Sequence, residues 1–504
     1  MSAIRRLLVV ALLVGIDTAG VSSQADLDVT AARAKQIAFH TIRLETEQAL
    51  VAVEQADRAD PRIMQEEVRL SIYRGDCDRA ARVAASPRYP SNNDEALAMA
   101  KIATSCARII AGATRRTDEG RGIEIIFQAP SDEGLFEELA MVIAQAREAI
   151  TQELGVDWPR PTRLLIVRDQ LSLSASTGLP YEAARTTGTA GIAKWGRVAM
   201  LSPAASPHGF AWRDTLAHEL THLGVTRATI DRAPLWLQEG LAKRLETRWR
   251  APKPFDERSA PEDAVLVGID KKIDLPLDKL GPSLAMLPSA EQAAVAYAEV
   301  VSFVGYYADH AADGALRKLL SELQLHEVDD ALRTASGSDL GQWDKQWRAW
   351  LARRMRPVKA TPPPRGEGLS SFDAVRLSEL LQKRGHLTAA LDELDRHPKA
   401  HEQPSYAHAR ARVFEALAQS EKAWSAVADP RAILHDFGPW WATRARLATN
   451  QEVANTSFDM ARGHNPLDFE TACEVNKGTN ATEAQRKKPL CQCAIARGEP
   501  STEP

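Results

Sequence analysis

The sequence predicts an α+β domain in the middle of the chain, with an all-helical region on either side. Helical periodicity, with apolar residues three and four positions apart, dominates residues 27–117 and returns beyond residue 368. Between these regions, short runs of β-forming residues alternate with helical stretches, which is the pattern of an α+β fold. A proline-rich linker at residues 357–368 separates the middle from the C-terminal region.

The first residues have the features of a signal peptide. Arg5 and Arg6 precede an apolar run at residues 7–16, and residues 23–25 (SQA) place small side chains where signal peptidase cleaves. The apolar run is shorter than the about 20 residues that span a bilayer, although an uncleaved N-terminal anchor is the alternative. We expect residues 1–25 to be a signal peptide and the protein to be exported, with no stable membrane span after cleavage.

The charge balance bears on which partners the protein binds, and the cysteines bear on the compartment in which it folds. The 63 basic and 67 acidic residues give a net charge of -4, so we expect no nucleic-acid partner. Disulfides persist in the oxidising compartments that exported proteins reach. Cys77 and Cys106 can join two helices of the N-terminal region, whereas Cys473 can pair with Cys491 or with Cys493. The alternative is that all five cysteines are free.

Each helical region contains a hairpin with a glycine turn. Residues 73–81 and 383–390 both show a helix, a tight turn at glycine and a second helix, as in a tetratricopeptide-type repeat. Ordinary helical hairpins explain the same pattern equally well, because no continuous repeat period connects the two. We expect an N-terminal helical region at residues 26–117 and a C-terminal helical domain at residues 369–470, both able to bind protein partners. A polar, cysteine-containing tail follows at residues 471–504, and its end is expected to be disordered.

The central domain is expected at residues 121–356. Its predicted elements are, in order, a strand at residues 122–127, a helix at about 133–154, a strand at 163–168 and a hairpin or strand at 191–201 that turns at Gly196.

A five-residue motif, HELTH, indicates metal chemistry. His218 and His222 are four positions apart, so on a helix both imidazoles lie on one face and can reach one ion at about 2.0–2.1 Å. Glu219 lies beside the first of them and can act as the general base for a water molecule at the metal. We expect Asp214 at the start of this helix and Gly224 at its end.

Two histidines leave the site incomplete, because catalytic zinc usually has three protein ligands and one open position. Glu239 lies seventeen positions after His222 (239 minus 222), in a segment that Pro234 can begin as a helix. A loop at residues 225–233 gives the chain room to turn back. The sequence therefore predicts Zn²⁺ as the cofactor and His218, His222 and Glu239 as its ligands.

These segments resemble a known family. AHELTHL (residues 217–223) followed by APLWLQEGLAKRLE (residues 233–246) resembles the gluzincin peptidases, and most closely the peptidase MA-like family of exported bacterial proteins. The resemblance covers about residues 122–354 and implies a zincin-like fold with a small sheet and an active-site helix. It implies the histidine ligands, the glutamate ligand and the general base at the positions named above, with a periplasmic or secreted location.

The resemblance also implies residues around the metal. An edge strand above the active-site helix would pair with an extended substrate, and residues 192–200 are the candidate. A downstream Tyr or His often stabilises the oxyanion; Tyr297 is the first candidate, and the rivals are Tyr306, Tyr307 and His310. The chain departs from the thermolysin pattern at Lys243, where an Asp would orient a ligand histidine, so the sequence identifies no such partner.

Together these features predict an exported zinc metallopeptidase that hydrolyses peptide bonds in peptide or protein substrates. The main alternative is a non-catalytic zinc-binding scaffold that binds proteins through its helical flanks. Glu219 argues against the scaffold, since a scaffold needs no acid beside its first ligand. A zinc hydrolase that acts on a non-peptide amide is a third hypothesis that the sequence leaves open.

Overall fold

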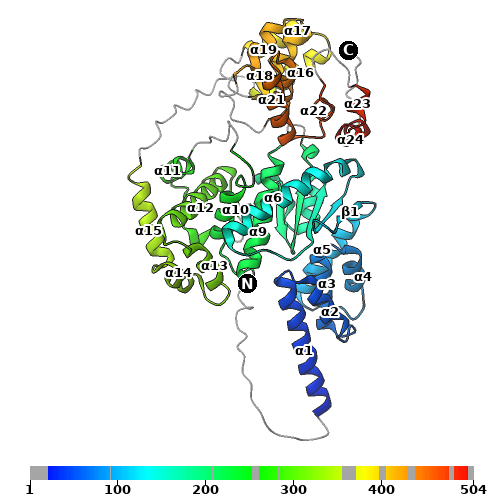
Figure 1. Cartoon of the computed structure of the whole chain (residues 1–504), viewed down its shortest axis with the longest axis vertical. Helices are drawn as coiled ribbons and strands as arrows, with labels where there is room; N and C mark the ends of the chain where they lie inside the picture. The colour runs from blue at the N-terminus through cyan, green and yellow to red at the C-terminus, as the bar shows by residue number, and fades with distance from the viewer. Residues whose placement is uncertain are drawn as a thin grey trace.

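Five short strands form one mixed sheet in the middle of the chain (Figure 1). The computed structural model describes residues 21–90, 92–206, 209–252, 260–280, 284, 287–354, 371–396, 404–429, 437–475 and 482–497. The apolar run of the expected signal peptide, the proline-rich linker and residues 498–504 lie outside the described residues. Within the described part of the chain, no helix has the length and apolar character that a membrane crossing requires.

The sheet has the order β1-β2-β3-β5-β4, in which β2, β3 and β5 run parallel and the two edge strands are antiparallel to their neighbours. The strands are β1 (Thr114–Asp118), β2 (Ile123–Phe127), β3 (Thr162–Val167), β4 (Gly191–Lys194) and β5 (Arg197–Leu201). The three inner strands are almost wholly buried, as their apolar sequences predict.

The sheet differs from the prediction at both edges. The sequence does not indicate β1, because its polar residues (TRRTD) lack apolar alternation and remain mostly exposed at the edge. This strand crosses the expected boundary at residue 117, so the sheet begins before the expected central domain. The hairpin at residues 191–201 with its turn at Gly196 is confirmed, but only β4 is an edge strand, since β5 pairs with β3.

Two long helices of the central domain form a layer beside the sheet. They are α6 (Phe136–Leu154) and α9 (Trp212–Thr229), which pack on each other, and α9 also contacts β4 and β5 (Figure 1). The expected helix end at Gly224 is wrong, because α9 continues to Thr229 and ends at Ile230 in a left-handed conformation. Gly224 instead lets α9 approach α6, since a Cβ there would lie 2.8 Å from Ile150.

A second helical layer follows α9. It is built on α10 (Leu235–Leu245) and α12 (Ala290–His310), which pack along each other. The other elements of the central domain are η1 (Pro130–Leu135), α7 (Gln170–Thr177), α8 (Tyr181–Thr187), η2 (Pro203–Ala205), α11 (Pro261–Lys271), η3 (Leu277–Lys279), α13 (Ala315–Glu322), α14 (Val328–Ser336) and α15 (Leu340–Leu351).

The N-terminal region is a set of helical hairpins packed against the sheet domain (Figure 1). Its helices are α1 (Val21–Ile42), α2 (Thr46–Glu54), α3 (Pro61–Tyr73), α4 (Cys77–Ala84) and α5 (Asp94–Ile110). The expected hairpin turn lies between α3 and α4 at Gly75, whose φ is 71°. The expected disulfide between Cys77 and Cys106 is present and ties α4 to α5. Helix α1 runs through the expected cleavage position at residues 23–25.

The C-terminal region is also helical, and its first hairpin turns at Gly385 as expected. Its helices are α16 (Ser371–Lys383), α17 (Leu387–Asp395), α18 (Pro404–Ala416), α19 (Ser420–Val427), α20 (Gly438–Leu447) and α21 (Gln451–His464). The tail beyond it forms α22 (Phe469–Ala472), α23 (Glu483–Arg486) and α24 (Pro489–Arg497).

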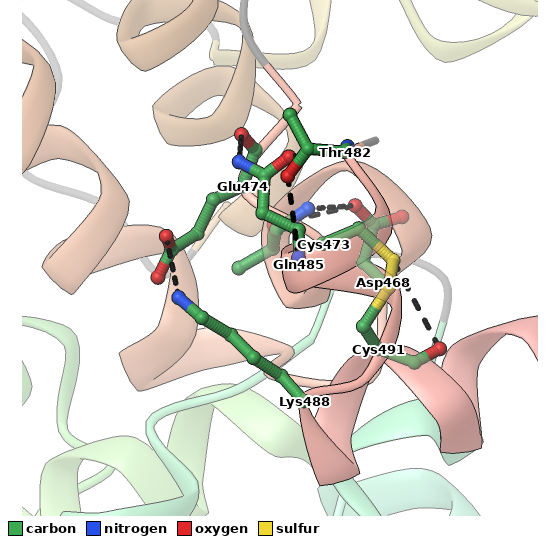
Figure 2. The surroundings of a disulfide bond; sticks show 8 residues. Asp468, Cys473, Glu474, Thr482, Gln485, Lys488 and Cys491 are labelled. Atoms are coloured by element: carbon green, nitrogen blue, oxygen red, sulfur yellow. Dashed lines mark hydrogen bonds and ion pairs between the residues drawn. A yellow bond between two sulfur atoms is a disulfide. The ribbon is translucent and has the colours of Figure 1, made fainter. Parts of the chain in front are cut away.

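The tail folds back onto the central domain. Figure 2 shows the disulfide between Cys473 and Cys491, which leaves Cys493 as a free thiol and decides between the two pairings that the sequence left open. Helix α24 packs on η1, where Arg497 forms an ion pair with the buried Asp132. The polar sequence of the tail gave no sign of this docking.

Candidate metal centre

The motif at residues 218–222 lies in the middle of α9, which is buried around most of its circumference. Packing on α6, α10, β4 and β5 buries the motif residues His218, Glu219 and Thr221 together with the apolar residues of the helix. Asp214 lies in the first turn, as expected, and accepts hydrogen bonds from Arg250 and from the Trp249 indole. These contacts join the start of α9 to the segment after α10.

The three expected metal ligands converge. The Nε2 atoms of His218 and His222 lie 3.5 Å and 3.9 Å from the Oε2 atom of Glu239. The two imidazole rings are 5.1 Å apart between centroids. One ligand atom from each of the three residues lies within 4.8 Å of the others, which is close enough to surround a single ion.

A metal ion fits this group of side chains on two observations. The Oε2 atom of Glu239 is buried and accepts no hydrogen bond, which is costly for a carboxylate oxygen unless a cation balances it. Burial alone raises the pKa of Glu239, but the two histidines hold it below its usual value, so the carboxylate is ionised. Two imidazoles and one carboxylate are a donor set that suits zinc.

The surroundings of the two imidazoles shift their pKa values in opposite directions. Burial lowers the pKa of His222 to about 4, so this ring is neutral, as a metal ligand must be. Burial also opposes protonation of His218, but the nearby carboxylates of Glu239 and Glu246 outweigh it and raise the pKa of His218 to about 9. His218 therefore lies between two carboxylates, in a site with an excess of negative charge.

Glu246 is the functional residue that the sequence analysis missed. Its Oε2 atom lies 3.4 Å from Nδ1 of His218, on the side of the ring away from Glu239, and it also pairs with Lys243 at 2.9 Å. Lys243 thus contacts Glu246 rather than a histidine, and Glu246 takes the place of the expected Asp. The spacing of the residues could have indicated this contact, because residues 239, 243 and 246 lie on one face of a helix.

Glu219 lies between the ligands and the edge strand. The Ala193 backbone N–H in β4 donates a hydrogen bond to Glu219 Oε2, with an N···O distance of 2.6 Å. Gly191 leaves room for this side chain, since a Cβ there would lie 2.8 Å from Glu219 Cγ. Burial raises the pKa of Glu219 to about 7, which suits a group that exchanges protons near neutral pH.

Tyr297 is the oxyanion candidate that α12 brings near the centre. Its ring lies 5.8 Å from the Lys243 ammonium, and burial together with Glu239, Glu219 and Glu246 raises its pKa, so the phenol keeps its proton.

The three rivals of Tyr297 lie in an aromatic cluster on the same helix. Tyr306 stacks on His310 at 4.0 Å between centroids, and Tyr307 is buried against Trp343 of α15. Their contacts are with α15, so the structure associates only Tyr297 with the carboxylates of the centre.

Comparison with the curated proteins and with the solved structures gives no match to the chain. A family model described as the Peptidase MA superfamily matches residues 144–353, a stretch that contains all of α9, α10 and α12. This match supports a peptidase MA-like family for the domain that holds His218, His222 and Glu239.

Proposed function

We propose that the protein is an exported zinc-dependent metallopeptidase of the gluzincin type. The observation that carries the proposal is the convergence of His218, His222 and Glu239, with a buried Glu239 oxygen that has no hydrogen-bond partner. The match to the Peptidase MA superfamily suggests a peptidase independently of this geometry. The two disulfides and the N-terminal sequence support export to an oxidising compartment.

The chain's own groups suit hydrolysis of a peptide bond. Zinc in this site would supply Lewis acidity, which polarises a carbonyl group and lowers the pKa of water to about 7. Glu219 would accept the proton of the attacking water and pass it to the leaving amine, a role that its contact with the edge strand beside the centre supports. Tyr297 would stabilise the oxyanion with its phenolic proton.

The edge strand offers a place for the substrate backbone. The Leu201 N–H donates to the Ala190 carbonyl, so in the antiparallel register the backbone groups of Gly191 and Ala193 face away from β5. The contact of the Ala193 N–H with Glu219 agrees with this direction. The Ala193 N–H is occupied by Glu219, but an extended peptide can pair with the Gly191 N–H and with the carbonyls of Gly191 and Ala193, which gives affinity with little preference for sequence.

Metal analysis and hydrolysis of a mixed peptide library test the proposal on the purified full chain. We expect about one zinc per chain for a three-ligand site. Glu219→Gln should retain zinc and lose roughly 10²- to 10⁴-fold in turnover, because only the proton acceptor is removed. Glu148→Gln is the matched control, since Glu148 is an exposed residue of α6.

Three results would contradict the proposal. Absence of bound zinc would remove the centre on which the reaction depends. Bound zinc without hydrolysis in the wild type would favour the non-catalytic scaffold, and cleavage of amides other than peptides would favour the third hypothesis.

A further inference from the structure

The tip of the β4–β5 hairpin is embedded in the N-terminal helical region. Its turn is formed by Trp195 and Gly196, which have φ angles of 58° and 66°. A Cβ on Gly196 would lie 2.5 Å from the Tyr73 ring and 3.0 Å from Leu44, both in the N-terminal region. The Trp195 ring meets the Tyr73 ring edge to face, at 6.3 Å between centroids. The turn therefore fits closely against Tyr73 and Leu44 of the N-terminal region, with no room for a side chain at Gly196.

Arg197, the first residue of β5, contacts the disulfide of the N-terminal region. Arg197 is 3% exposed, and its guanidinium lies 3.5 Å from Cys77 Sγ and 3.2 Å from Cys106 Sγ. It also donates a hydrogen bond to the Ser176 carbonyl. Among the described residues no carboxylate pairs with it, so its position depends on the disulfide that joins α4 to α5 and on that carbonyl.

The other strand of the same hairpin reaches the metal centre. Ala193, whose N–H binds Glu219, is separated from the embedded turn by Lys194 alone. Both strands are short, and register pairs Lys194 with Arg197 across the turn. A displacement of the turn is therefore transmitted directly to the backbone that contacts Glu219.

The N-terminal region also holds the far end of the active-site helix. Arg227, in the last turn of α9, lies 2.7 Å from Glu45 and donates to the Arg43 carbonyl. Two elements position Glu219: α9 carries it and β4 binds it. Both are therefore in contact with the N-terminal helical region, β4 through the hairpin turn.

We propose that the N-terminal helical region is a positioning element of the catalytic centre, which acts by docking the β4–β5 hairpin through Tyr73, Gly196 and Arg197. Docking holds the Ala193 N–H against Glu219 and fixes the edge strand that receives substrate. The catalytic consequence rests on the proposed function, whereas the docking and its effect on β4 do not.

Gly196→Ala in the full chain tests this inference, with Gly188→Ala as the matched control. Both glycines have a φ of 66°, so both substitutions strain the backbone alike, but a Cβ on Gly188 meets nothing within 4 Å. Gly196→Ala should lower kcat about 10- to 100-fold through misplacement of Glu219 and should retain zinc. It should also accelerate amide hydrogen exchange of residues 191–194, whereas Gly188→Ala should change neither quantity.

The exchange measurement separates this inference from the proposed function. If the wild type hydrolyses no peptide, the proposed function fails. The amide hydrogen exchange of residues 191–194 then still tests whether the N-terminal region holds the hairpin in place. Unchanged exchange in Gly196→Ala overturns the positioning role whatever the activity. If Gly196→Ala does not fold, Tyr73→Ala takes its place, because it removes the receiving ring without crowding; unchanged exchange there overturns the role equally.

Discussion

At the scale of single residues, the carboxylate of Glu246 is the feature that distinguishes the two histidines that we propose as metal ligands. It faces Nδ1 of His218 at 3.4 Å and leaves Nε2 of that ring directed toward Glu239. A carboxylate in this position fixes the tautomer and orientation of a ligand imidazole and increases its basicity. Lys243 in turn fixes Glu246.

Glu246→Gln should therefore weaken zinc binding about 10- to 100-fold while the fold is retained. The amide keeps the size of the side chain but removes the negative charge that faces His218. Titration of the zinc-loaded protein with a competing chelator measures the change, with Glu148→Gln as the surface control. Equal zinc affinity in the two variants would show that Glu246 does not support the ligand.

At the scale of elements, the close pairing of α10 and α12 brings Glu239 toward Tyr297. Gly240, the residue after Glu239, makes this approach possible, because a Cβ there would lie 2.3 Å from Val304 Cγ2 and 2.7 Å from the Val300 carbonyl. The second of these contacts is backbone, which cannot rotate away. The helices thus depend on a residue without a side chain at their crossing.

Gly240→Ala and Gly305→Ala should change stability in opposite directions. Overpacking at Gly240 is expected to cost about 1–3 kcal/mol, more than the gain of about 1 kcal/mol from replacing a helical glycine. Gly305 lies in α12 with nothing within 4 Å of its Cβ, so alanine there should stabilise by up to about 1 kcal/mol. Measurement of the thermal unfolding temperature of both variants tests this prediction. A shift in the same direction for both would argue against the close contact of α10 and α12 at Gly240.

At the scale of the whole molecule, α9, the helix that carries the candidate metal ligands, is held at both ends by the helical regions. Near its start, the Trp212 indole donates to the Arg462 carbonyl, and Arg213 lies 3.7 Å from Asp459, both in α21. Near its end, Arg227 binds Glu45 of the N-terminal region. The flanks are therefore part of the support of α9, in addition to any partners that they bind.

The Glu45 contact predicts a dependence of stability on pH. Burial raises the pKa of Glu45, but hydrogen bonds from His40, Arg227 and Arg43 outweigh it and hold the pKa at about 2, below the usual value of 4.5 for a glutamate. A lowered pKa stabilises the folded chain fully above about pH 4.5, and this contribution is lost as the pH falls toward 2. With allowance for solvent screening it amounts to about 1–3 kcal/mol.

Comparison of wild type with Glu45→Gln measures this contribution. We expect the variant to unfold at a lower denaturant concentration at pH 7, and the difference to shrink between pH 4.5 and 2 as Glu45 becomes protonated in the wild type. A difference that stays constant down to pH 2 would mean that the ionised form of Glu45 does not supply the stability.

The sequence by itself determined the local features of this protein. The spacing of His218 and His222 fixes both imidazoles on one helical face, and the apolar runs at β2, β3 and β5 predict buried strands, because helix and strand periodicity are local properties of the chain. The hairpin at Gly196 also follows from local sequence, whereas the pair of Cys77 with Cys106 was one of the possibilities that the sequence allowed.

Only the tertiary structure decided the features that depend on distant neighbours. Gly224 has the sequence signature of a helix end, yet packing against Ile150 keeps α9 continuous through it. The polar strand β1 forms because β2 offers an unpaired edge, which no property of its own residues indicates. The contacts of Glu246 with His218 and of Ala193 with Glu219 join separate elements, and their geometry follows from how those elements pack rather than from any single segment.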